Sequence, residues 1–502
     1  MRRVARQLVP VCVALALGLA PVVAATAAEG ARTGSGTVPA SDWPTYHHDA
    51  LRTGDGVIRG VYHTLRARID WHLPTRTAAE RADQIYASPL VVGTTAFVTT
   101  LENRVYAISL RTGRTIWARA LGHAYTQPSG VCGDIGPNVG VVGTPTIDEA
   151  RGELFVVADV GIGVGGQVPV HRLFGLSLTT GRVMLDRDVD PPGQQSIYLL
   201  ERVSLAIDKG RVIFGMGGNA GDCGQYHGWV ISVPETGSGP IARFEVGPGP
   251  GQGQGAVWMA GGAPVIDGRG NVFVADGNGS ATSSGDAYDY SDAVLKLTPT
   301  MHLLDYFAPI TWTSDNAGDA DLGSSAPMLL PDGELIQVGK TETGYVLNPN
   351  HLGHIDPAVR TFSACSGLGD DHGDTLVGSL VVLACSGGLD AYRYTPTAPW
   401  GTQVWTQANT NGPAVFAAGL VWSVNASQDS SGTSTLYGLA PATGDVRLQL
   451  AFGPVQNHFP SPAVGDNMVV VCSTTSLLAF PPLSAAGRFA RCGGAVGAWC
   501  SC

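Results

Sequence analysis

The stretch ASPLVVGTTAFVTTLENRVYAISLRTGRTIW, residues 87–117, decides the fold. It starts with a small residue, Pro, β-branched residues and Gly, and continues as an apolar strand, a polar turn and a second strand. It ends in Thr-Gly before a third strand. Apolar and polar positions alternate in FVTTLENRVYAI, as in half-buried antiparallel strands. This stretch therefore predicts short strands joined by tight turns.

The same unit recurs along the rest of the chain. Eight copies are anchored at Pro89, Pro145, Leu205, Pro264, Pro327, Leu376, Pro413 and Pro462. Four-stranded propeller blades repeat every 40–50 residues or so, and the wider spacings in the first half indicate inserted loops. We therefore predict an all-β fold, an eight-bladed β-propeller of four-stranded antiparallel blades.

The last unit lacks a final strand, whereas the segment LRARIDWHLP, residues 65–74, precedes the first unit and has no blade of its own. We expect this N-terminal strand to pair with the last blade and close the ring, because closure removes free sheet edges. An open row of three-stranded units is the alternative, and it would leave such edges exposed.

The composition supports this architecture and excludes several classes of protein. Gly accounts for 68 and Pro for 32 of the 502 residues, which disfavours a helical bundle. The hydrophobic share is 44%, enough for a large core and too high for a disordered chain. The net charge is −11, and the lysines are Lys209, Lys296 and Lys340. Nucleic-acid binding through phosphate contacts is not expected.

The N-terminus resembles an export signal. Arg2, Arg3 and Arg6 precede an apolar run, which is followed by Ala25-Thr26-Ala27, a cleavage site of the A-x-A kind. A membrane anchor is the alternative, although prolines interrupt the run. We expect a signal peptide at 1–27, a flexible segment at 28–42, the propeller at 43–482 and a Cys-containing tail at 483–502. The mature protein would be secreted and would have no membrane span.

Eight cysteines remain after removal of the signal peptide, and an even number in an exported chain predicts disulfides. Cys365 and Cys385 flank one strand-rich segment and form the first predicted pair. Cys132 and Cys223, in two Gly-rich loops, form the second. The pairing of the other four cysteines stays open. The chain has no CxxCH motif for haem attachment.

The repeat S-P-x-V-x-G…V-Y-A-x-x-x-x-T-G-x-x-x-W resembles that of the pyrroloquinoline-quinone (PQQ) propeller family over residues 43–482. The resemblance implies the fold but not one chemistry, because both quinoprotein alcohol dehydrogenases and non-catalytic scaffolds of outer-membrane assembly carry these blades. The adjacent-cysteine disulfide of many of the dehydrogenases is absent. The chain is most similar to polyvinyl-alcohol dehydrogenase-like members.

Two inserted segments resemble cofactor-binding parts of the dehydrogenases. QGQGAVW ends at Trp258, where the family places the indole that stacks under the quinone. VFVADGNGS carries Asn278, where the family has an Asn that ligates Ca²⁺, a cation that prefers oxygen ligands. A buried blade Trp and an Asn in a tight turn are the ordinary structural alternatives.

Three further residues are assigned by the same resemblance. In TWTSDNAGDADLGSS, Asp319 maps to the general base beside the metal, with Asp321 as its neighbour. Lys340, after a fifth-blade strand, maps to the cation that contacts the quinone oxygens. Asp222 is a loose match to the acidic Ca²⁺ ligand. The metal set implied is thus Asn278, Asp319 and Asp222, with a solvated acidic turn and a surface Lys as alternatives.

The resulting hypothesis is a secreted quinoprotein dehydrogenase that oxidises a simple or polymeric alcohol with PQQ and Ca²⁺. A separate acceptor such as a cytochrome would receive the electrons, because no haem motif is present. The alternative is a propeller that binds protein or polysaccharide without redox chemistry. Convergence of Asn278, Asp319, Lys340 and Trp258 at one mouth of the ring would favour the enzyme.

Overall fold

The structure is a computed structural model that describes the ring and its N-terminal segment. The described residues are 42–78, 83–129, 133, 135–219, 224–355, 359–365, 373–394, 401–425, 432–455 and 461–483. The predicted signal peptide, Cys132, Asp222, Cys223 and the tail after residue 483 lie outside these ranges. Within them, no helix combines the length and apolar character needed to cross a bilayer.

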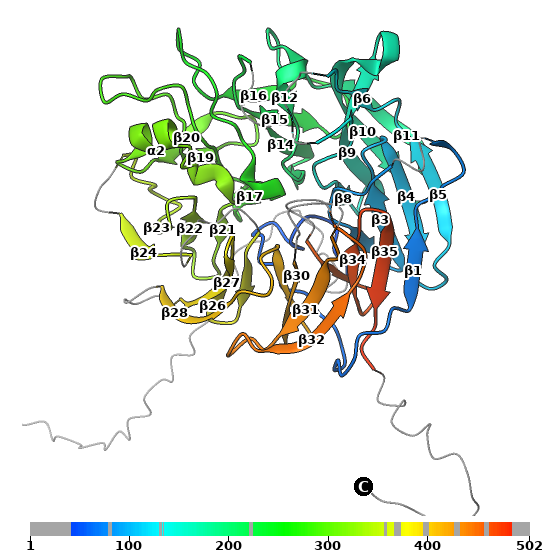
Figure 1. Ribbon diagram of the computed structural model, residues 1–502. Helices are drawn as coiled ribbons and strands as arrows, with labels where there is room; N and C mark the ends of the chain where they lie inside the picture. Colours follow the sequence, from blue (N-terminus) through cyan, green and yellow to red (C-terminus); the bar gives the residue numbers. More distant parts are fainter. Residues whose placement is uncertain are drawn as a thin grey trace, which may run out of the picture. The chain divides into compact units, whose positions relative to one another are not determined.

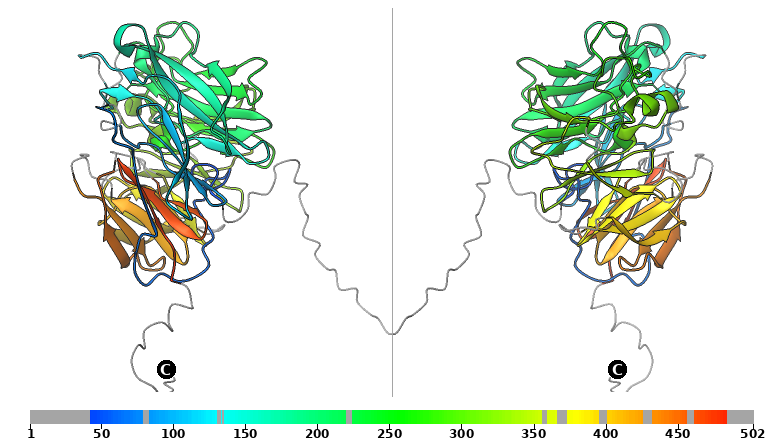
Figure 2. Two further views of the ribbon diagram at one scale, coloured as in Figure 1. Left: turned by 90° about the vertical axis from the view of Figure 1, so that its right-hand side faces the viewer. Right: turned by 90° about the vertical axis from the view of Figure 1, so that its left-hand side faces the viewer.

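Eight antiparallel sheets follow one another around a ring, as the repeat predicts (Figure 1). Seven of them have four strands each, and the third has an extra short strand. The views from the two sides show the sheets side by side as blades (Figure 2). The predicted eight-bladed β-propeller is therefore confirmed.

The two inner strands of each blade are rich in fully buried apolar residues. The innermost strands of the first seven blades are β2 (Leu90–Val92), β8 (Thr146–Asp148), β13 (Ala206–Asp208), β17 (Val265–Ile266), β21 (Met328–Leu329), β25 (Thr375–Val377) and β29 (Ala414–Ala417). The second strands are β3 (Thr95–Thr99), β9 (Glu153–Ile162), β14 (Arg211–Gly218), β18 (Val272–Ala275), β22 (Leu335–Val338), β26 (Leu380–Cys385) and β30 (Leu420–Asn425).

The outermost strands expose alternate residues, whereas the third strands are mostly buried. The third strands are β4 (Arg104–Ser109), β10 (Val168–Ser177), β15 (Trp229–Pro234), β19 (Val294–Leu297), β23 (Thr343–Leu347), β27 (Gly388–Arg393) and β31 (Thr435–Leu439). The outermost are β5 (Thr115–Ala120), β11 (Val183–Asp188), β16 (Ala242–Glu245), β20 (Leu303–Phe307), β24 (Arg360–Ser363), β28 (Thr402–Gln407) and β32 (Val446–Ala451).

The eighth blade combines strands from both ends of the chain. Its three C-terminal strands are β33 (Ala463–Gly465), β34 (Met468–Cys472) and β35 (Ser476–Phe480), and its fourth is β1 (Ile69–His72). β1 pairs antiparallel with β35, with Ile69 opposite Ala479. The segment 65–74 thus supplies the outer strand that the last repeat lacks.

The segment at 43–61, here called the strap, lies along the inner strands at the centre of the ring (Figure 1). It forms hydrogen bonds with all eight blades in ring order. In the first seven blades its partners are Val91, Ile147, Leu205, Ile266, Leu329, Leu376 and Phe416. In the eighth, the Arg59 backbone N–H donates to Asn467 Oδ1 at 2.6 Å. Trp43 and Tyr46 of the strap are almost fully buried, so the strap fills part of the channel.

The connections between blades, and for η1 the hairpin from β9 to β10 in the second blade, contain the remaining elements. These are β6 (Tyr125–Thr126), β7 (Asn138–Val139), β12 (Leu199–Leu200), α2 (Trp312–Gly318) and the 3₁₀ turns η1 (Val164–Gly166), η2 (Ser196–Tyr198), η3 (Met259–Gly261) and η4 (Leu322–Ser324). α2 lies at the rim beside β20 (Figure 1). Sequence analysis did not predict this helix and gave a solvated acidic turn as the alternative for this segment.

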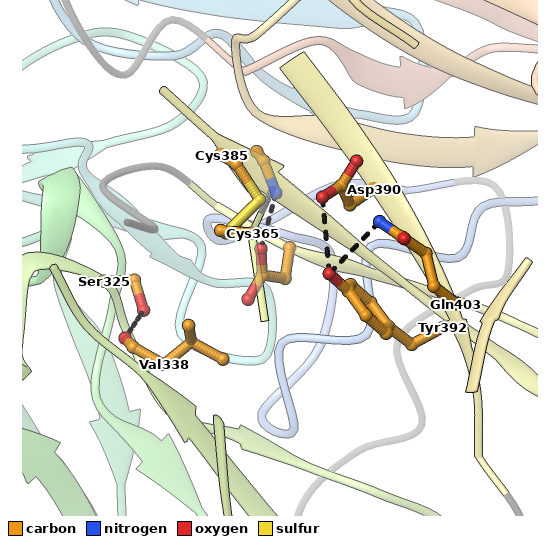
Figure 3. Close-up of a disulfide and its surroundings, with 9 residues drawn as sticks. Ser325, Val338, Cys365, Cys385, Asp390, Tyr392 and Gln403 are labelled. Carbon is orange, nitrogen blue, oxygen red and sulfur yellow. Dashed lines mark hydrogen bonds between the residues drawn. A yellow bond between two sulfur atoms is a disulfide. The ribbon is translucent and has the colours of Figure 1, made fainter. Parts of the chain in front are cut away.

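The predicted disulfide between Cys365 and Cys385 is present, with Cα atoms 5.4 Å apart (Figure 3). It joins the chain just after β24 to the end of β26, and so links the fifth blade to the sixth. Nearby, Tyr392 donates a hydrogen bond to Asp390 at 3.3 Å (Figure 3). Cys472 is a buried free thiol, and burial raises its pKa. The other predicted pair lies outside the described residues.

Candidate functional site

Three of the predicted site residues lie on loops at one end of neighbouring blades. Asn278 follows β18, Lys340 follows β22, and Asp319 ends α2 in the connection from β20 to β21. In antiparallel blades, the loop after the second strand and the connection after the fourth strand lie at the same end. The fourth and fifth blades therefore bring the three residues together.

Direct contacts join these side chains. Asn278 Nδ2 donates to Asp319 Oδ1 at 2.9 Å, and Lys340 Nζ lies 3.0 Å from the same oxygen. Lys340 Nζ also lies 2.5 Å from Asp321 Oδ2, and Asp321 Oδ1 accepts the Asn278 backbone N–H at 2.8 Å. We call these four residues the open cluster. The acid next to Asp319, which sequence analysis named only as a neighbour, is thus a central contact.

Burial divides the open cluster into an inner and an outer half. The Asp321 side chain is 0% exposed and that of Lys340 35%, while the Asp319 side chain is 74% exposed. Burial lowers the pKa of Lys340, but the negative charges of Asp321 and Asp319 outweigh this effect, so its pKa is raised. Lys340 is therefore a fixed cation, and Asp319 is a carboxylate that solvent and a substrate can reach.

α2 holds Asp319 in an unusual backbone conformation. Asp319 is the C-terminal cap of the helix, with φ +54°, and its N–H bonds to the Asp315 carbonyl. The left-handed region is rare for residues other than Gly, Asn and Asp, and strain of this kind is frequent at functional sites. Asn316, one turn earlier, donates to Ala281 O at 2.7 Å and accepts the Gly279 N–H at 2.7 Å. The helix thereby ties Asp319 to the loop of Asn278.

Gly277 makes the close approach of these loops possible. A Cβ atom at this position would lie 2.3 Å from Asp321 Oδ1, closer than any real contact. Only Gly therefore lets the backbone at Asn278 reach the buried carboxylate.

Trp258 lies on the loop next to that of Asn278. Its Nε1 donates to Gly218 O at 3.1 Å, which fixes the ring, and the Arg202 guanidinium carbon lies 6.0 Å from the ring centroid. Gly255 N–H bonds to Asn278 O at 2.6 Å, so the two loops are directly connected. Arg202 was not foreseen, because an Arg in a blade connection has no distinguishing sequence pattern.

These residues supply some of the groups that the cofactors implied by the family resemblance would need. Asn278 Oδ1 is buried without a hydrogen-bond partner, and with the two carboxylates it supplies the oxygen donors that Ca²⁺ prefers. A flat indole beside a guanidinium suits a planar quinone that carries carboxylates. In the described part of the chain, no group of three or more His, Cys, Asp or Glu side chains is placed to hold a metal. Asp222, the third predicted ligand, lies outside the described residues.

Two further carboxylates lie buried in the fourth blade. Asp276 Oδ1 accepts the Ala293 N–H at 2.9 Å, and Asp292 Oδ1 accepts the Leu322 N–H at 2.9 Å. Each has a second oxygen without a partner. Burial raises the pKa of both well above the usual range, and the charge of Asp321 adds to this effect. Sequence analysis missed them because the sequence alone does not distinguish a buried Asp from an exposed Asp in a loop.

A second acid–cation–acid group lies in the second blade and in the connection after it. His171 Nδ1 is 2.6 Å from Asp190 Oδ1, and His171 Nε2 is 3.2 Å from Asp159 Oδ1. We call these three residues the closed cluster, because His171 is 0% exposed. Burial lowers the pKa of His171, but the two carboxylates outweigh this effect and raise it to about 9. Burial also raises the pKa of Asp159 to about 7.

Known proteins resemble the chain in part of its sequence and in its fold. Residues 71–287 match a sequence-family model described as outer membrane protein assembly factor BamB. No curated protein sequence matches the chain. Quinohemoprotein alcohol dehydrogenase from Comamonas testosteroni has a TM-score of 0.65 at 18% identity, over 90% of this chain and 81% of that one. This chain therefore has the same fold as that dehydrogenase.

Two other solved structures extend the comparison. A europium-containing methanol dehydrogenase has a TM-score of 0.62 at 15% identity, over 87% of this chain and 91% of that one. BamB from Moraxella catarrhalis has a TM-score of 0.51 at 13% identity, over 83% of this chain and 98% of that one. The fold is thus similar both to that of dehydrogenases and to that of an assembly factor, so function must be argued from the site.

Proposed function

We propose that this chain is a secreted quinoprotein-type dehydrogenase that oxidises a simple or polymeric alcohol with PQQ and Ca²⁺. The observation that carries the proposal is the open cluster, in which Asn278, Asp319 and Lys340 are in direct contact although they come from different loops. A separate acceptor such as a cytochrome takes the electrons.

Each residue of the site has a distinct role in this proposal. Asp319 accepts the proton of the substrate hydroxyl, because its carboxylate is the exposed one. Lys340 and the Asn278 amide hold that carboxylate in place through Oδ1. Asn278 Oδ1 and the carboxylates hold Ca²⁺, and Trp258 and Lys340 contact PQQ. When bound, PQQ with Ca²⁺ supplies the electron acceptor of the reaction.

The test is to load the purified chain with Ca²⁺ and PQQ and to measure dye reduction with simple and polymeric alcohols. Asp319→Asn keeps the side-chain shape and suits the left-handed backbone, so PQQ should still bind, as measured by fluorescence quenching. Turnover should fall about 10²–10⁴-fold, the usual contribution of a general base. Trp258→Ala should instead weaken PQQ binding.

Asp445→Asn is the matched control, because Asp445 is also an exposed carboxylate beside a cation, Arg447, but lies in another blade. It should leave turnover unchanged. If Asp319→Asn keeps full turnover, Asp319 is not the base.

A non-catalytic scaffold is the second candidate, and two observations favour it. Lys340 already neutralises the carboxylates of the open cluster. The matching family model is that of an assembly factor. If the wild-type chain neither binds PQQ nor reduces dye with Ca²⁺ present, this alternative replaces the enzyme.

A further inference from the structure

A cavity of about 310 Å³ lies beside α2. One side is formed by the chain from Phe307 at the end of β20 to Asp315 in α2, and the other by β23 and β24 of the next blade. Asp315 lies in the first turn of α2 and Asp319 caps its last. Asp315, which lines the cavity, is therefore one helical turn from Asp319.

The polar part of the cavity wall consists mainly of hydroxyl groups. They come from four threonines on three segments, Thr311, Thr341, Thr343 and Thr361. The Thr311 and Thr343 hydroxyls already donate, to Asp315 Oδ2 at 2.6 Å and to Thr341 O at 3.4 Å, so they can accept a hydrogen bond from a ligand hydroxyl. The hydroxyls therefore match a ligand with several hydroxyl groups of its own.

The apolar part of the wall contains an aromatic pair. The rings of Phe307 and Tyr345 lie 4.9 Å apart, centroid to centroid, and both residues are buried. Ile310 is 62% exposed and lines the mouth. Ring faces and aliphatic side chains suit the C–H groups of a carbon backbone. An exposed Ile at the mouth would lose contact with water when a ligand binds.

Charge narrows the ligand class further. Neither Lys, Arg nor His is among the lining residues, and the one charged group is Asp315. An anion is therefore disfavoured. Asp315 Oδ2 already accepts the Thr311 hydroxyl at 2.6 Å. Its other carboxyl oxygen can accept a hydrogen bond from a ligand hydroxyl.

We propose that this cavity is a binding site for a neutral polyhydroxylated molecule, such as a sugar unit or a sugar alcohol. The hydroxyls pair with the threonines and Asp315, and the C–H face packs on the aromatic pair and Ile310. The lining contains no residue of the open cluster, and the ligand needs neither Ca²⁺ nor PQQ in order to bind.

Ligand-observed NMR and calorimetry on the full chain, without PQQ or Ca²⁺, test the proposal. The probes are sorbitol and glucose (neutral), gluconate (anionic) and choline (cationic). Sorbitol or glucose should bind at millimolar concentrations and gluconate should not. Thr343→Val and Thr361→Val should each weaken binding several-fold, with unchanged circular dichroism. Thr402→Val, on the outer strand β28 of the next blade, is the matched control and should bind like the wild type.

Three outcomes would overturn the proposal. One is that neither neutral probe binds at 100 mM or so, far above ordinary ligand concentrations. Another is that choline binds and the neutral probes do not, which would make Asp315 an amine site. The third is that the Thr343 and Thr361 variants bind as well as the Thr402 variant.

Discussion

The open and closed clusters have the same charge pattern, a cation between two carboxylates, but differ in their access to solvent. In the closed cluster His171 is 0% exposed, and Asp159 and Asp190 are 4% and 20% exposed. In the open cluster one carboxylate, Asp321, is equally buried, but Asp319 is 74% exposed. The same pattern can thus hold loops together or present a reactive group.

The two clusters also differ in their cation, which is Lys340 in the open cluster and His171 in the closed cluster. Lys340 reaches from a loop to a half-exposed position, where its ammonium group retains some water. His171 lies inside β10 and uses both ring nitrogens, one for each carboxylate. A buried pair is costly to break, because the remaining charge has no compensation. Removing the cation should therefore cost more stability in the closed cluster.

The largest effect is expected for His171→Leu, which leaves Asp159 and Asp190 without their cation. At pH 6 the free energy of unfolding should fall by about 3–5 kcal/mol in urea titrations. Because the folded-state pKa of His171 is about 9 and its ordinary value 6.5, its contribution is complete below pH 6.5 and is lost as pH rises through 9. At pH 10 the variant should therefore differ less from the wild type in its free energy of unfolding than it does at pH 6, by on the order of 3 kcal/mol.

The control is His72→Leu, which removes an exposed histidine 3.1 Å from Asp70. This variant should lose little stability at either pH. A His171 variant with the same cost at pH 6 and pH 10 would contradict the charged state of the closed cluster.

Lys340→Met tests the open cluster in the same way. It removes the partner of the buried Asp321 carboxylate, and we expect a loss of about 3 kcal/mol, the lower end for a buried pair, since Lys340 is 35% exposed. The double variant with Asp321→Asn should recover part of the loss. Lys209→Met, at an exposed lysine, is the control. A larger loss for Lys340→Met than for His171→Leu would reverse the comparison.

Gly277→Ala tests whether close packing holds the open cluster together. Its Cβ would meet Asp321 Oδ1 at 2.3 Å, so we expect a loss of roughly 1–3 kcal/mol, as for other overpacked sites. Gly268→Ala in the same blade is the matched control, because nothing lies within 4 Å of the added methyl group. Equal stability of the two variants would mean that Asp321 moves freely.

The smallest effect concerns the strained backbone of the open cluster. Asp319→Gly and Asp319→Ala both remove the carboxylate, but Gly accepts φ +54° without strain. The Gly variant should be more stable than the Ala variant by about 1 kcal/mol in thermal or urea unfolding. No difference between the two would show that the helix end relaxes when the carboxylate is lost.

The sequence predicted the blades because most of them repeat the same order of Pro, aliphatic strand, Gly and turn, with Leu205 and Leu376 in place of Pro in two units. Asn278, Asp319 and Lys340 were assigned through the resemblance to the PQQ propeller family, and the structure shows these three side chains in contact. The disulfide from Cys365 to Cys385 was predicted because the two cysteines flank one strand-rich segment, and it is confirmed.

The sequence did not reveal which carboxylates and cations contact one another in the two clusters. Asp321 and Asp319 are two residues apart, and only the structure shows that one is buried and the other exposed. The closed cluster joins Asp159, His171 and Asp190, which occupy two strands and a loop and form no sequence motif. α2 was missed because a helix of seven residues inside a loop insertion has too little periodicity to be recognised.

The strap has a consequence for the order in which the chain can fold. The strap precedes all eight blades in the chain, yet it forms hydrogen bonds with each of them, and Val61 accepts a hydrogen bond from Leu483. β1 likewise cannot pair until β35 has been synthesised. Its residue Ile69 pairs with Ala479, which lies 479 − 69 = 410 residues later in the chain. Contacts of such long range slow folding, because the chain must close a very long loop before they form. The ring can therefore become complete only after its last blade has been synthesised.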